Sequence, residues 1–396
     1  METLFRTYNR LVQQIDCRHL RYLYSQIDWK DRLVGIKGAR GVGKTTMMLQ
    51  YIKLNFTDWT KALYVSLDHI WFSQHSLLEL VEYHYIHGGT YLFLDEVHRY
   101  HNWSIELKNI YDSYPDMHIV FIGSSLLEID YSIADLSRRC RLYQLRGLSF
   151  REYLFFEDVA DFPVLPIEEI LQGHVMTAAR MTAEVKLLPY FEKYMEKGYY
   201  PFYKDSEDGY YARILQIVTT ILENDIPAVE NIEFESIQKI KRLLVILSEM
   251  VPFTLNVSTL CGTLSVSRNH LLKLLQLLER SALLYELFSP AKGLKQLVKP
   301  EKILFDNTNL MMALGNKTEV GTLRETFFAN QVREIGVLQM PEEGDFLLDE
   351  QYLFEVGGKG KGFQQIRNKE DSFVVADGIE IGMGNKIPLW LFGFLY

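Results

Sequence analysis

At residues 38–45 the chain reads Gly38-Ala39-Arg40-Gly41-Val42-Gly43-Lys44-Thr45. The segment fits the phosphate-loop pattern in full, with an apolar run at 33–37 before it and a helix-length segment at 45–55 after it. In such a turn the backbone N–H groups point inward around phosphate oxygens, and the helix N-terminus adds its positive dipole end. A glycine turn without a ligand is the alternative, but the Lys-Thr pair and the flanking strand disfavour it.

The phosphate-loop pattern also predicts a separate role for each of two side chains. Lys44 is expected to reach the β- and γ-phosphates, and the Thr45 hydroxyl to complete the coordination of Mg2+. ATP and Mg2+ are therefore the predicted cofactors. The expected nucleotide-binding residues are Gly38, Ala39, Arg40, Gly41, Val42, Gly43, Lys44, Thr45 and Thr46.

A second apolar run, at 91–94, ends in two carboxylates, Asp95 and Glu96. The carboxyl ends of parallel strands are where open α/β sheets bind ligands, so both side chains are expected beside the phosphate loop. We expect Asp95 to hold Mg2+ through water and Glu96 to orient and polarise the attacking water. The alternative for Glu96 is a solvated residue at a strand end.

Apolar runs at 33–37, 62–67, 91–94 and 118–122 alternate with helix-length segments. This alternation predicts an α/β fold with a parallel sheet covered on both faces. The last run leads into Gly123-Ser124-Ser125, which would place a hydroxyl near the γ-phosphate. Alone, that tripeptide indicates only a turn. It follows the third of three apolar runs, however, and each of these runs leads into a residue suited to contact phosphate or its metal ion.

The composition excludes several classes of protein. A chain of 396 residues with 48% apolar and 23% charged residues is globular, and at about 150 residues per domain it holds two or three domains. Its net charge of −9 leaves no overall basic field for nucleic acid. Three scattered cysteines fit neither a disulfide framework nor a metal site, and no apolar stretch reaches the ~20 residues that span a bilayer. We expect a cytoplasmic protein with no membrane partner.

The motifs resemble those of AAA+-like bacterial and archaeal ATPases that join a P-loop domain to a winged helix and a C-terminal nuclease-like domain. The resemblance covers nearly the whole chain. The residues that carry it are 38–46, Leu94-Asp95-Glu96-Val97 followed by Trp103, Gly123-Ser124-Ser125, and Leu148-Ser149-Phe150-Arg151-Glu152-Tyr153.

This resemblance implies roles for two further residue types. Ser125 or Ser124 matches the sensor of the γ-phosphate, and Arg139 falls on the arginine that precedes the closing motif. That arginine usually follows a glycine, which is Arg138 here, so a finger or sensor role competes with simple solvation or pairing with carboxylates. The predicted catalytic residues are Glu96, Lys44, Ser125 and Arg139, and the predicted metal ligands are Thr45 and Asp95.

The resemblance and the helical periodicity together predict five segments. They are a helical lead-in at 1–30, a P-loop ATPase domain at 31–155, a helical lid at 156–236, a winged helix at 237–290 and a small nuclease-like α+β domain at 291–396. The winged helix is locally basic and makes DNA a candidate partner. Its leucine-rich last helix, however, equally suits a packing module.

In the last segment Glu325, Asp345, Glu355 and Lys359 resemble the order of the PD-(D/E)xK nucleases. The position two residues after Glu355 is Gly357, so Lys359 or Lys361 would have to substitute from a glycine-rich turn. A misplaced lysine costs orders of magnitude in rate. We expect a degenerate nuclease-like fold that binds rather than cleaves.

The sequence as a whole predicts a Mg2+-dependent ATPase that acts on a macromolecular target through its C-terminal modules. The alternative is a non-hydrolysing ATP switch that works as a DNA-binding or scaffold protein, and a third hypothesis is a nuclease gated by ATP. Glu96 separates the first two, because a switch has no use for a water-orienting carboxylate. A homo-oligomer is compatible with either.

Overall fold

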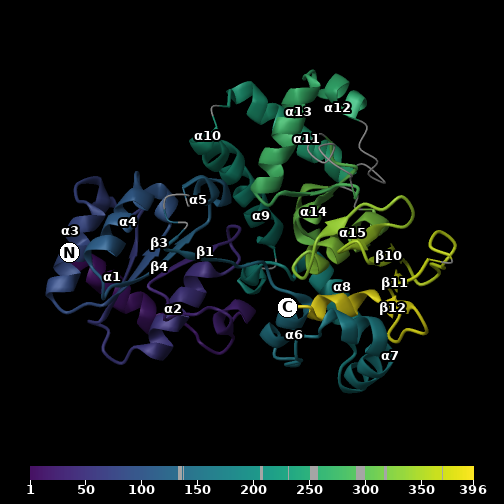
Figure 1. The fold of residues 1–396 in the computed structure, drawn as a ribbon, viewed down its shortest axis with the longest axis horizontal. Helices are drawn as coiled ribbons and strands as arrows, with labels where there is room; N and C mark the ends of the chain where they lie inside the picture. Colours follow the sequence, from purple (N-terminus) through teal and green to yellow (C-terminus); the bar gives the residue numbers. More distant parts are fainter. Residues whose placement is uncertain are drawn as a thin grey trace. The chain divides into compact units, whose positions relative to one another are not determined.

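The chain divides into two compact units (Figure 1). The structure, a computed structural model, describes residues 1–132, 136, 138–205, 208–230, 232–249, 257–290, 299–315, 319–367 and 369–396. Unit 1 comprises residues 1–147 and returns for 224–231, and unit 2 comprises 148–223 and 232–396. Residues 224–231 thus belong to unit 1, although residues 148–223 of unit 2 come before them in the sequence.

Unit 1 is a sheet covered by helices. Its strands are β1 (Leu33–Lys37), β2 (Ala62–Ser66), β3 (Tyr91–Asp95), β4 (His118–Gly123) and β5 (Arg141–Gln144). Its helices and 3-10 turns are α1 (Glu2–Gln14), η1 (Tyr22–Ser25), α2 (Lys44–Asn55), η2 (Ile70–Ser73), α3 (Leu77–Ile86), η3 (Val97–Arg99), α4 (Trp103–Ser113), α5 (Leu126–Ser132) and α10 (Ile226–Val229). Figure 1 shows α1 and α2 on one side of β1, β3 and β4, and α3 and α4 on the other.

The five strands run parallel in the order β2-β3-β4-β1-β5. The central strands are buried on both faces, which is why their sequences read as continuous apolar runs instead of alternating. Since all strands share one direction, the residues that follow β1, β3 and β4 meet at one edge of the sheet. The predicted α/β class and parallel sheet are confirmed, and the four expected strands match β1 to β4 to within one residue. Strand β5, whose residues are only partly buried, was not foreseen.

Unit 2 contains a second sheet and most of the helices. Its strands are β6 (Leu284–Leu287), β7 (Lys302–Phe305), β8 (Leu338–Gln339), β9 (Phe346–Leu348), β10 (Tyr352–Gly357), β11 (Ser372–Ala376) and β12 (Lys386–Pro388). Its helices and 3-10 turns are α6 (Phe150–Phe156), α7 (Ile167–Glu184), α8 (Leu187–Lys197), η5 (Pro201–Lys204), α9 (Tyr210–Thr220), α11 (Phe234–Glu249), α12 (Val257–Leu264), α13 (Arg268–Arg280), α14 (Thr308–Leu314), α15 (Val320–Val332) and η8 (Leu389–Phe394). A π-helical turn, Ile221–Asp225, follows α9.

The second sheet has the order β12-β11-β10-β9-β8, with parallel pairing from β12 to β10 and antiparallel pairing from β10 to β8. Helix α15 packs on β10 and on η8, so that Phe328 contacts Phe346, Phe354 and Phe392. These rings belong to the large apolar core of unit 2, which also takes in α6 to α8. The last residues of the chain, 389–396, are buried in this core.

Residues 234–305 contain the element order expected for 237–290. Helices α11, α12 and α13 are followed by β6 and β7, which form an antiparallel ladder from Leu284–Phe305 to Leu287–Lys302. In the segment expected to be helical, α7 and α8 are separated by extended backbone at Val185. The winged-helix and nuclease-like assignments, and the five segment boundaries, remain predictions.

Among the described residues, no helix is both long and apolar enough to cross a membrane.

Ser149 makes two bonds in unit 2. Its Oγ accepts the N–H of Glu152 and so caps α6 in a capping box, and the same hydroxyl donates to the carbonyl oxygen of Tyr396. One short side chain thus fixes both the start of α6 and the end of the chain.

We predict that Ser149→Ala lowers the free energy of unfolding by about 2 kcal/mol, because it removes both the cap of α6 and one of two side-chain hydrogen bonds to the oxygen of Tyr396, the other coming from Nε of Arg151. Ser267→Ala is the matched control, since the exposed Ser267 Oγ only accepts the N–H of His270, and we expect a loss of about 1 kcal/mol. Urea denaturation followed by circular dichroism measures both. Equal losses in the two variants would contradict the role of the Tyr396 contact.

Candidate nucleotide-binding site

The loop at 38–45 connects β1 to α2 and turns sharply at two glycines. Gly41 and Gly43 have φ of 81° and 95°, a region that residues with a Cβ rarely enter. A Cβ at Gly38 would collide with the carbonyl oxygen of Leu145, which follows β5. The glycines therefore let the loop bend around a central space while it stays packed on the sheet.

Lys44 is the first residue of α2 and is buried. Its Nζ donates to the carbonyl oxygens of Gly38 and Ala39, at 2.7 and 2.9 Å. Burial lowers the pKa of this amine to about 8, against the opposing effect of the nearby carboxylates Glu96 and Asp95. The hydrogen-bond partners named above for the ammonium are neutral carbonyl groups. Phosphate oxygens in this loop would give it a charged hydrogen-bond partner.

Asp95 ends β3 and is held by three donors. Its Oδ2 accepts the hydroxyl of Thr45 at 2.7 Å and the phenol of Tyr64 at 2.9 Å, and its Oδ1 accepts the N–H of Glu96 at 2.7 Å. Burial raises the pKa of Asp95, while the hydrogen bond from Thr45 acts in the other direction. A hydroxyl and a carboxylate oxygen side by side are hard ligands, and this donor set fits Mg2+ bound together with phosphates and water.

Glu96 has backbone strain and three side-chain partners. Its φ of 49° lies in the left-handed region, which is unfavourable for a residue other than glycine. Its carboxylate accepts the hydroxyl of Ser124, at 2.9 and 3.1 Å to the two oxygens, and lies 3.2 Å from Nε2 of His98. The guanidinium of Arg40 is 4.0 Å away.

His98 is buried and neutral. Burial, followed in effect by the charge of Arg40, lowers its pKa to about 3. Its Nε2 lies 3.2 Å from Oε2 of Glu96 and 3.4 Å from Nη2 of Arg40. The neutral imidazole therefore packs beside both the Glu96 carboxylate and the Arg40 guanidinium.

Residues 224–231 reach the phosphate loop through one ion pair. The guanidinium of Arg40 binds both oxygens of Asp225, with Nη2–Oδ1 at 2.8 Å and Nε–Oδ2 at 3.1 Å. Asp225 is only 4% exposed, so the pair is largely shielded from water. This arrangement fixes the Arg40 side chain between Asp225, Glu96 and His98.

A second arginine forms hydrogen bonds with the phosphate loop. Arg21 lies in the lead-in before β1, and its guanidinium donates to the carbonyl oxygens of Val42, Arg146 and Gly147. The buried side chain thus links the loop to the segment after β5. The lead-in is part of the site's scaffold, a role that its helical periodicity did not reveal.

The structure brings most of the predicted residues together. Lys44, Thr45, Asp95 and Glu96 lie at the carboxyl edge of the sheet, joined by the contacts above. The serine that contacts Glu96 is Ser124, whereas Ser125 is almost fully buried. Which of the two serines senses the γ-phosphate stays a prediction.

Arg139 lies elsewhere in unit 1. It precedes the amino end of β5, where its Nε and Nη2 bind Asp112 at 2.9 and 3.0 Å, and its guanidinium lies over the ring of Tyr111. The phosphate loop instead follows the carboxyl end of β1. Within one chain Arg139 does not reach the site, so the predicted finger role requires a second copy.

Sequence reasoning missed Tyr64, His98, Asp225 and Arg21. Tyr64 is in β2, one strand from Asp95, and reads as an ordinary apolar position. His98 follows Asp95-Glu96 by two residues, and that proximity was the one available signal. Asp225 is 185 residues from Arg40 in the chain, and nothing in its sequence surroundings marks it.

The acidic residues predicted in unit 2 do come together, but with different lysines. Burial raises the pKa values of Glu325 and Glu355, and the charge of Asp345 contributes to both shifts. Lys361, and not Lys359, pairs with the fully buried Glu355, while Lys302 pairs with Glu325 at 2.9 Å. Among the described residues, no group of three or more His, Cys, Asp or Glu is arranged to hold a metal ion.

The position of Lys361 has a simple explanation. A Cβ built on Gly357 would lie 2.7 Å from Cδ of Lys361, so this lysine fills the space beside the glycine. The expected substitution from the glycine-rich turn is therefore made by Lys361.

Comparison with known proteins agrees with the geometry of unit 1. Residues 30–154 match a family described as an AAA domain. This region is similar to AAA domains. Residues 188–320 match a domain of unknown function, DUF8612. An uncharacterized protein of Methanocaldococcus jannaschii, MJ1637, is 28% identical over 391 residues, which cover 90% of this chain and 82% of the relative.

Two solved structures illustrate the wider similarity. The ORC1 protein of Aeropyrum pernix in complex with DNA is 12% identical, with 78% of this chain and 91% of that chain covered and a TM-score of 0.33. AMPPCP-bound DnaA from Aquifex aeolicus is 12% identical, with 70% and 88% covered and a TM-score of 0.26.

We predict that Asp225→Asn lowers the free energy of unfolding of unit 1 by about 2 kcal/mol, because a bidentate, shielded pair with Arg40 is broken. Asp112→Asn is the matched control: its pair with Arg139 is also bidentate but more exposed, so we expect a loss below about 1 kcal/mol. Chemical denaturation followed by tryptophan fluorescence compares the two variants. A larger loss in Asp112→Asn would show that burial does not set the strength of these pairs.

Proposed function

We propose that unit 1 binds ATP with Mg2+ and hydrolyses it. The observation that carries the proposal is the meeting of Lys44, the Thr45–Asp95 pair and Glu96 at one edge of the sheet. An ammonium, a hard-ligand pair and a carboxylate are the groups that phosphoryl transfer to water requires. The AAA domain match over 30–154 supports the same reading.

Each of these residues has a defined task in the proposed reaction. Thr45 and Asp95 would hold Mg2+, which supplies charge neutralisation at the phosphate oxygens. Lys44 would exchange the carbonyl oxygens of Gly38 and Ala39 for phosphate oxygens. ATP binding would therefore replace neutral carbonyl partners of Lys44 by an anion, and this favours the charged form of the amine over the neutral form.

Glu96 would orient and polarise the attacking water. In the structure its carboxylate is occupied by Ser124 and His98, so it must leave at least one of these partners before it can accept a proton from water. The strained backbone at Glu96 fits a residue that is held in place by its surroundings. We therefore propose that the carboxylate is held back until the nucleotide is bound.

The rival function is a switch that binds ATP without hydrolysing it. A switch needs Lys44 and Asp95, but the Glu96 carboxylate would then serve only to hold His98 and Ser124. The three-dimensional contacts of Glu96 fit both functions, and substitution at this residue separates them.

The target of the proposed ATPase would be engaged by unit 2. DNA is the candidate partner through residues 237–290, where α13 carries Arg268, Lys273 and Arg280. A homo-oligomer is proposed as well, because Arg139 could act at the site of a second copy.

We predict that Lys44→Ala weakens ATP binding and that Glu96→Gln retains binding but lowers the steady-state rate of phosphate release by at least about a hundredfold, since only the water-orienting charge is lost. Glu82→Gln, an exposed position on α3, is the control and should behave as wild type. Equilibrium binding of a fluorescent ATP analogue and a phosphate-release assay report the two properties. Unchanged hydrolysis by Glu96→Gln would falsify the catalytic role.

We also propose that the acidic residues of unit 2 do not catalyse efficient cleavage of nucleic acid. Glu355 and Glu325 are each neutralised by a lysine, Lys361 and Lys302, so their oxygens are already engaged. Competition with an internal ammonium weakens a carboxylate as a metal ligand.

The expected result is no Mg2+- or Mn2+-dependent nicking of plasmid or single-stranded DNA by the purified protein. Asp345→Ala and Glu355→Ala are prepared in parallel. Cleavage by the wild type that disappears in both variants would overturn the proposal, whereas cleavage that survives in both identifies a contaminant.

A further inference from the structure

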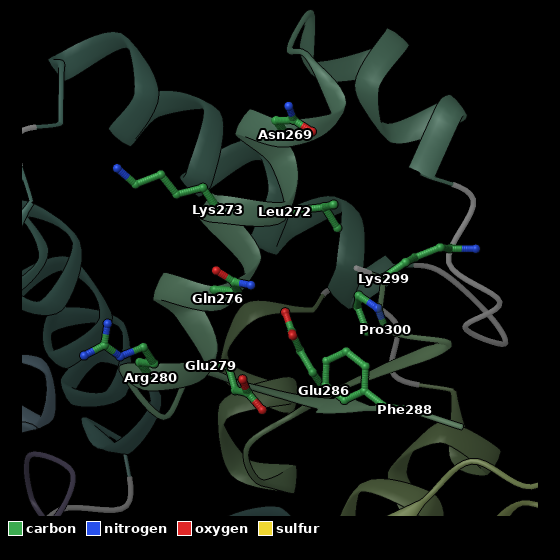
Figure 2. Close-up of a pocket in the computed structure, with 10 residues that line it drawn as sticks. All are labelled: Asn269, Leu272, Lys273, Gln276, Glu279, Arg280, Glu286, Phe288, Lys299 and Pro300. Carbon is green, nitrogen blue, oxygen red and sulfur yellow. The ribbon is translucent and has the colours of Figure 1, made fainter. Parts of the chain in front are cut away.

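A cavity of about 570 Å3 lies in unit 2, between α13 and the β6–β7 hairpin (Figure 2). Along α13 it is lined by polar residues at helical spacing, Asn269, Lys273, Gln276 and Arg280, which share one face of the helix. Its volume is within the range of small-molecule sites. Two of its lining residues, Lys273 and Arg280, belong to the segment proposed to engage DNA, but Glu286 and Phe288 have no role so far.

The hairpin side of the cavity carries a buried carboxylate without a full set of partners. Glu286, on β6, is 5% exposed, and its Oε1 has no hydrogen-bond partner within the part of the chain that the structure describes. Figure 2 shows its carboxyl group directed into the cavity, between Gln276 and the ring of Phe288. An unpartnered buried oxygen is costly, which favours a ligand that donates hydrogen bonds to it.

A second acidic residue also favours a ligand that donates hydrogen bonds. Glu279, on α13, also lines the cavity. Burial, followed in effect by the charge of Glu279, raises the pKa of Glu286 to about 8, so this acid is largely protonated at neutral pH before a ligand binds. Hydrogen-bond donors on a ligand would stabilise its ionised form, whereas an anionic group at that depth would be disfavoured.

The rest of the lining has a different chemistry. Leu272, Phe288 and Pro300 provide an apolar wall, and Phe288 offers the face of an aromatic ring. Lys273 and Lys299 extend outward from the margin of the cavity in Figure 2. A ligand that fits is thus flat, donates hydrogen bonds at its inner edge and carries negative charge at its outer end.

We propose that this cavity binds the guanine base of a nucleotide, with Glu286 accepting hydrogen bonds from the base and the phosphate lying outside, toward the basic margin of the cavity. Guanine is the natural base with two adjacent donors on its Watson–Crick edge, N1–H and N2–H2, and a single carboxylate can accept both. Adenine and uracil each offer an acceptor beside one donor there. The ring of Phe288 is a stacking partner for the base.

The guanine may belong to either of two sources with the same chemistry, an unpaired position in a nucleic acid or a free nucleotide, and the experiment has an arm for each. The inference deepens the proposed function, since it names the target chemistry that unit 2 recognises. Binding is measured without ATP or Mg2+. Failure here consequently leaves hydrolysis by unit 1 untouched, and loss of hydrolysis in Glu96→Gln leaves guanine binding untouched.

The test uses the full chain and fluorescence anisotropy with labelled oligothymidylates that carry one central guanine, inosine or adenine. Inosine keeps N1–H but lacks the exocyclic amine, so it removes one donor without changing the shape of the ring. We expect the guanine oligonucleotide to bind at least about tenfold more tightly than the other two. For the second source, unlabelled GMP, IMP and AMP compete with the probe.

Variants connect the preference to the cavity. Glu286→Gln keeps the shape of the side chain but places an amide donor against the donors of guanine, and should abolish the preference for guanine over inosine. Glu301→Gln, at an exposed position before β7, is the matched control and should preserve it. Thermal unfolding by circular dichroism checks that both variants are folded, and the guanine–inosine comparison on the wild type does not depend on any variant.

Each outcome decides the proposal. A guanine preference that Glu286→Gln abolishes supports it, with the oligonucleotide or GMP identifying the source. Equal binding of all three bases, no binding of oligonucleotides or mononucleotides, or a preference that survives in Glu286→Gln overturns it. Tight binding of an arginine-rich peptide with no discrimination among bases would also overturn it, because the carboxylates would then recognise a cationic protein segment.

Discussion

Asp95 is the point at which the proposed nucleotide site is assembled. One carboxylate receives Thr45 from the start of α2, Tyr64 from β2 and the backbone N–H of Glu96. A buried carboxylate must have such donors, since each unpaired oxygen would cost about 1–3 kcal/mol. These bonds hold Thr45 beside Asp95, where we propose that both bind Mg2+, and they include the backbone N–H of Glu96. The loop, the strand β3 and the catalytic candidate are therefore connected through one carboxylate.

The neighbours of Glu96 connect this centre to a distant segment. Glu96 contacts Ser124 and His98, His98 lies next to Arg40, and Arg40 is paired with Asp225. Any phosphate that binds the Arg40 guanidinium must therefore compete with Asp225.

Unit 2 contains buried carboxylates of two kinds. Glu355 and Glu325 are each matched by a lysine, and this matching explains why the nuclease-like pattern does not amount to a metal site. Glu286 is equally buried but has an oxygen without a partner in the described chain, and it faces a cavity. The contrast between satisfied and unsatisfied groups, more than the number of acidic residues, indicates where a ligand is needed.

The sequence by itself determined the parallel sheet, the phosphate loop and the identity of Lys44, Thr45, Asp95 and Glu96, because each depends on local patterns: apolar runs, glycine spacing and residues that directly follow strands. It also pointed to Glu325, Asp345 and Glu355 as neighbours. Only the tertiary structure decided that Ser124 contacts Glu96, that Lys361 replaces Lys359, that Arg139 lies at the other edge of the sheet, and that Asp225 pairs with Arg40. These choices depend on which side chains meet across separate elements. Contacts between side chains of separate elements depend on how these elements pack, so local sequence patterns do not predict them.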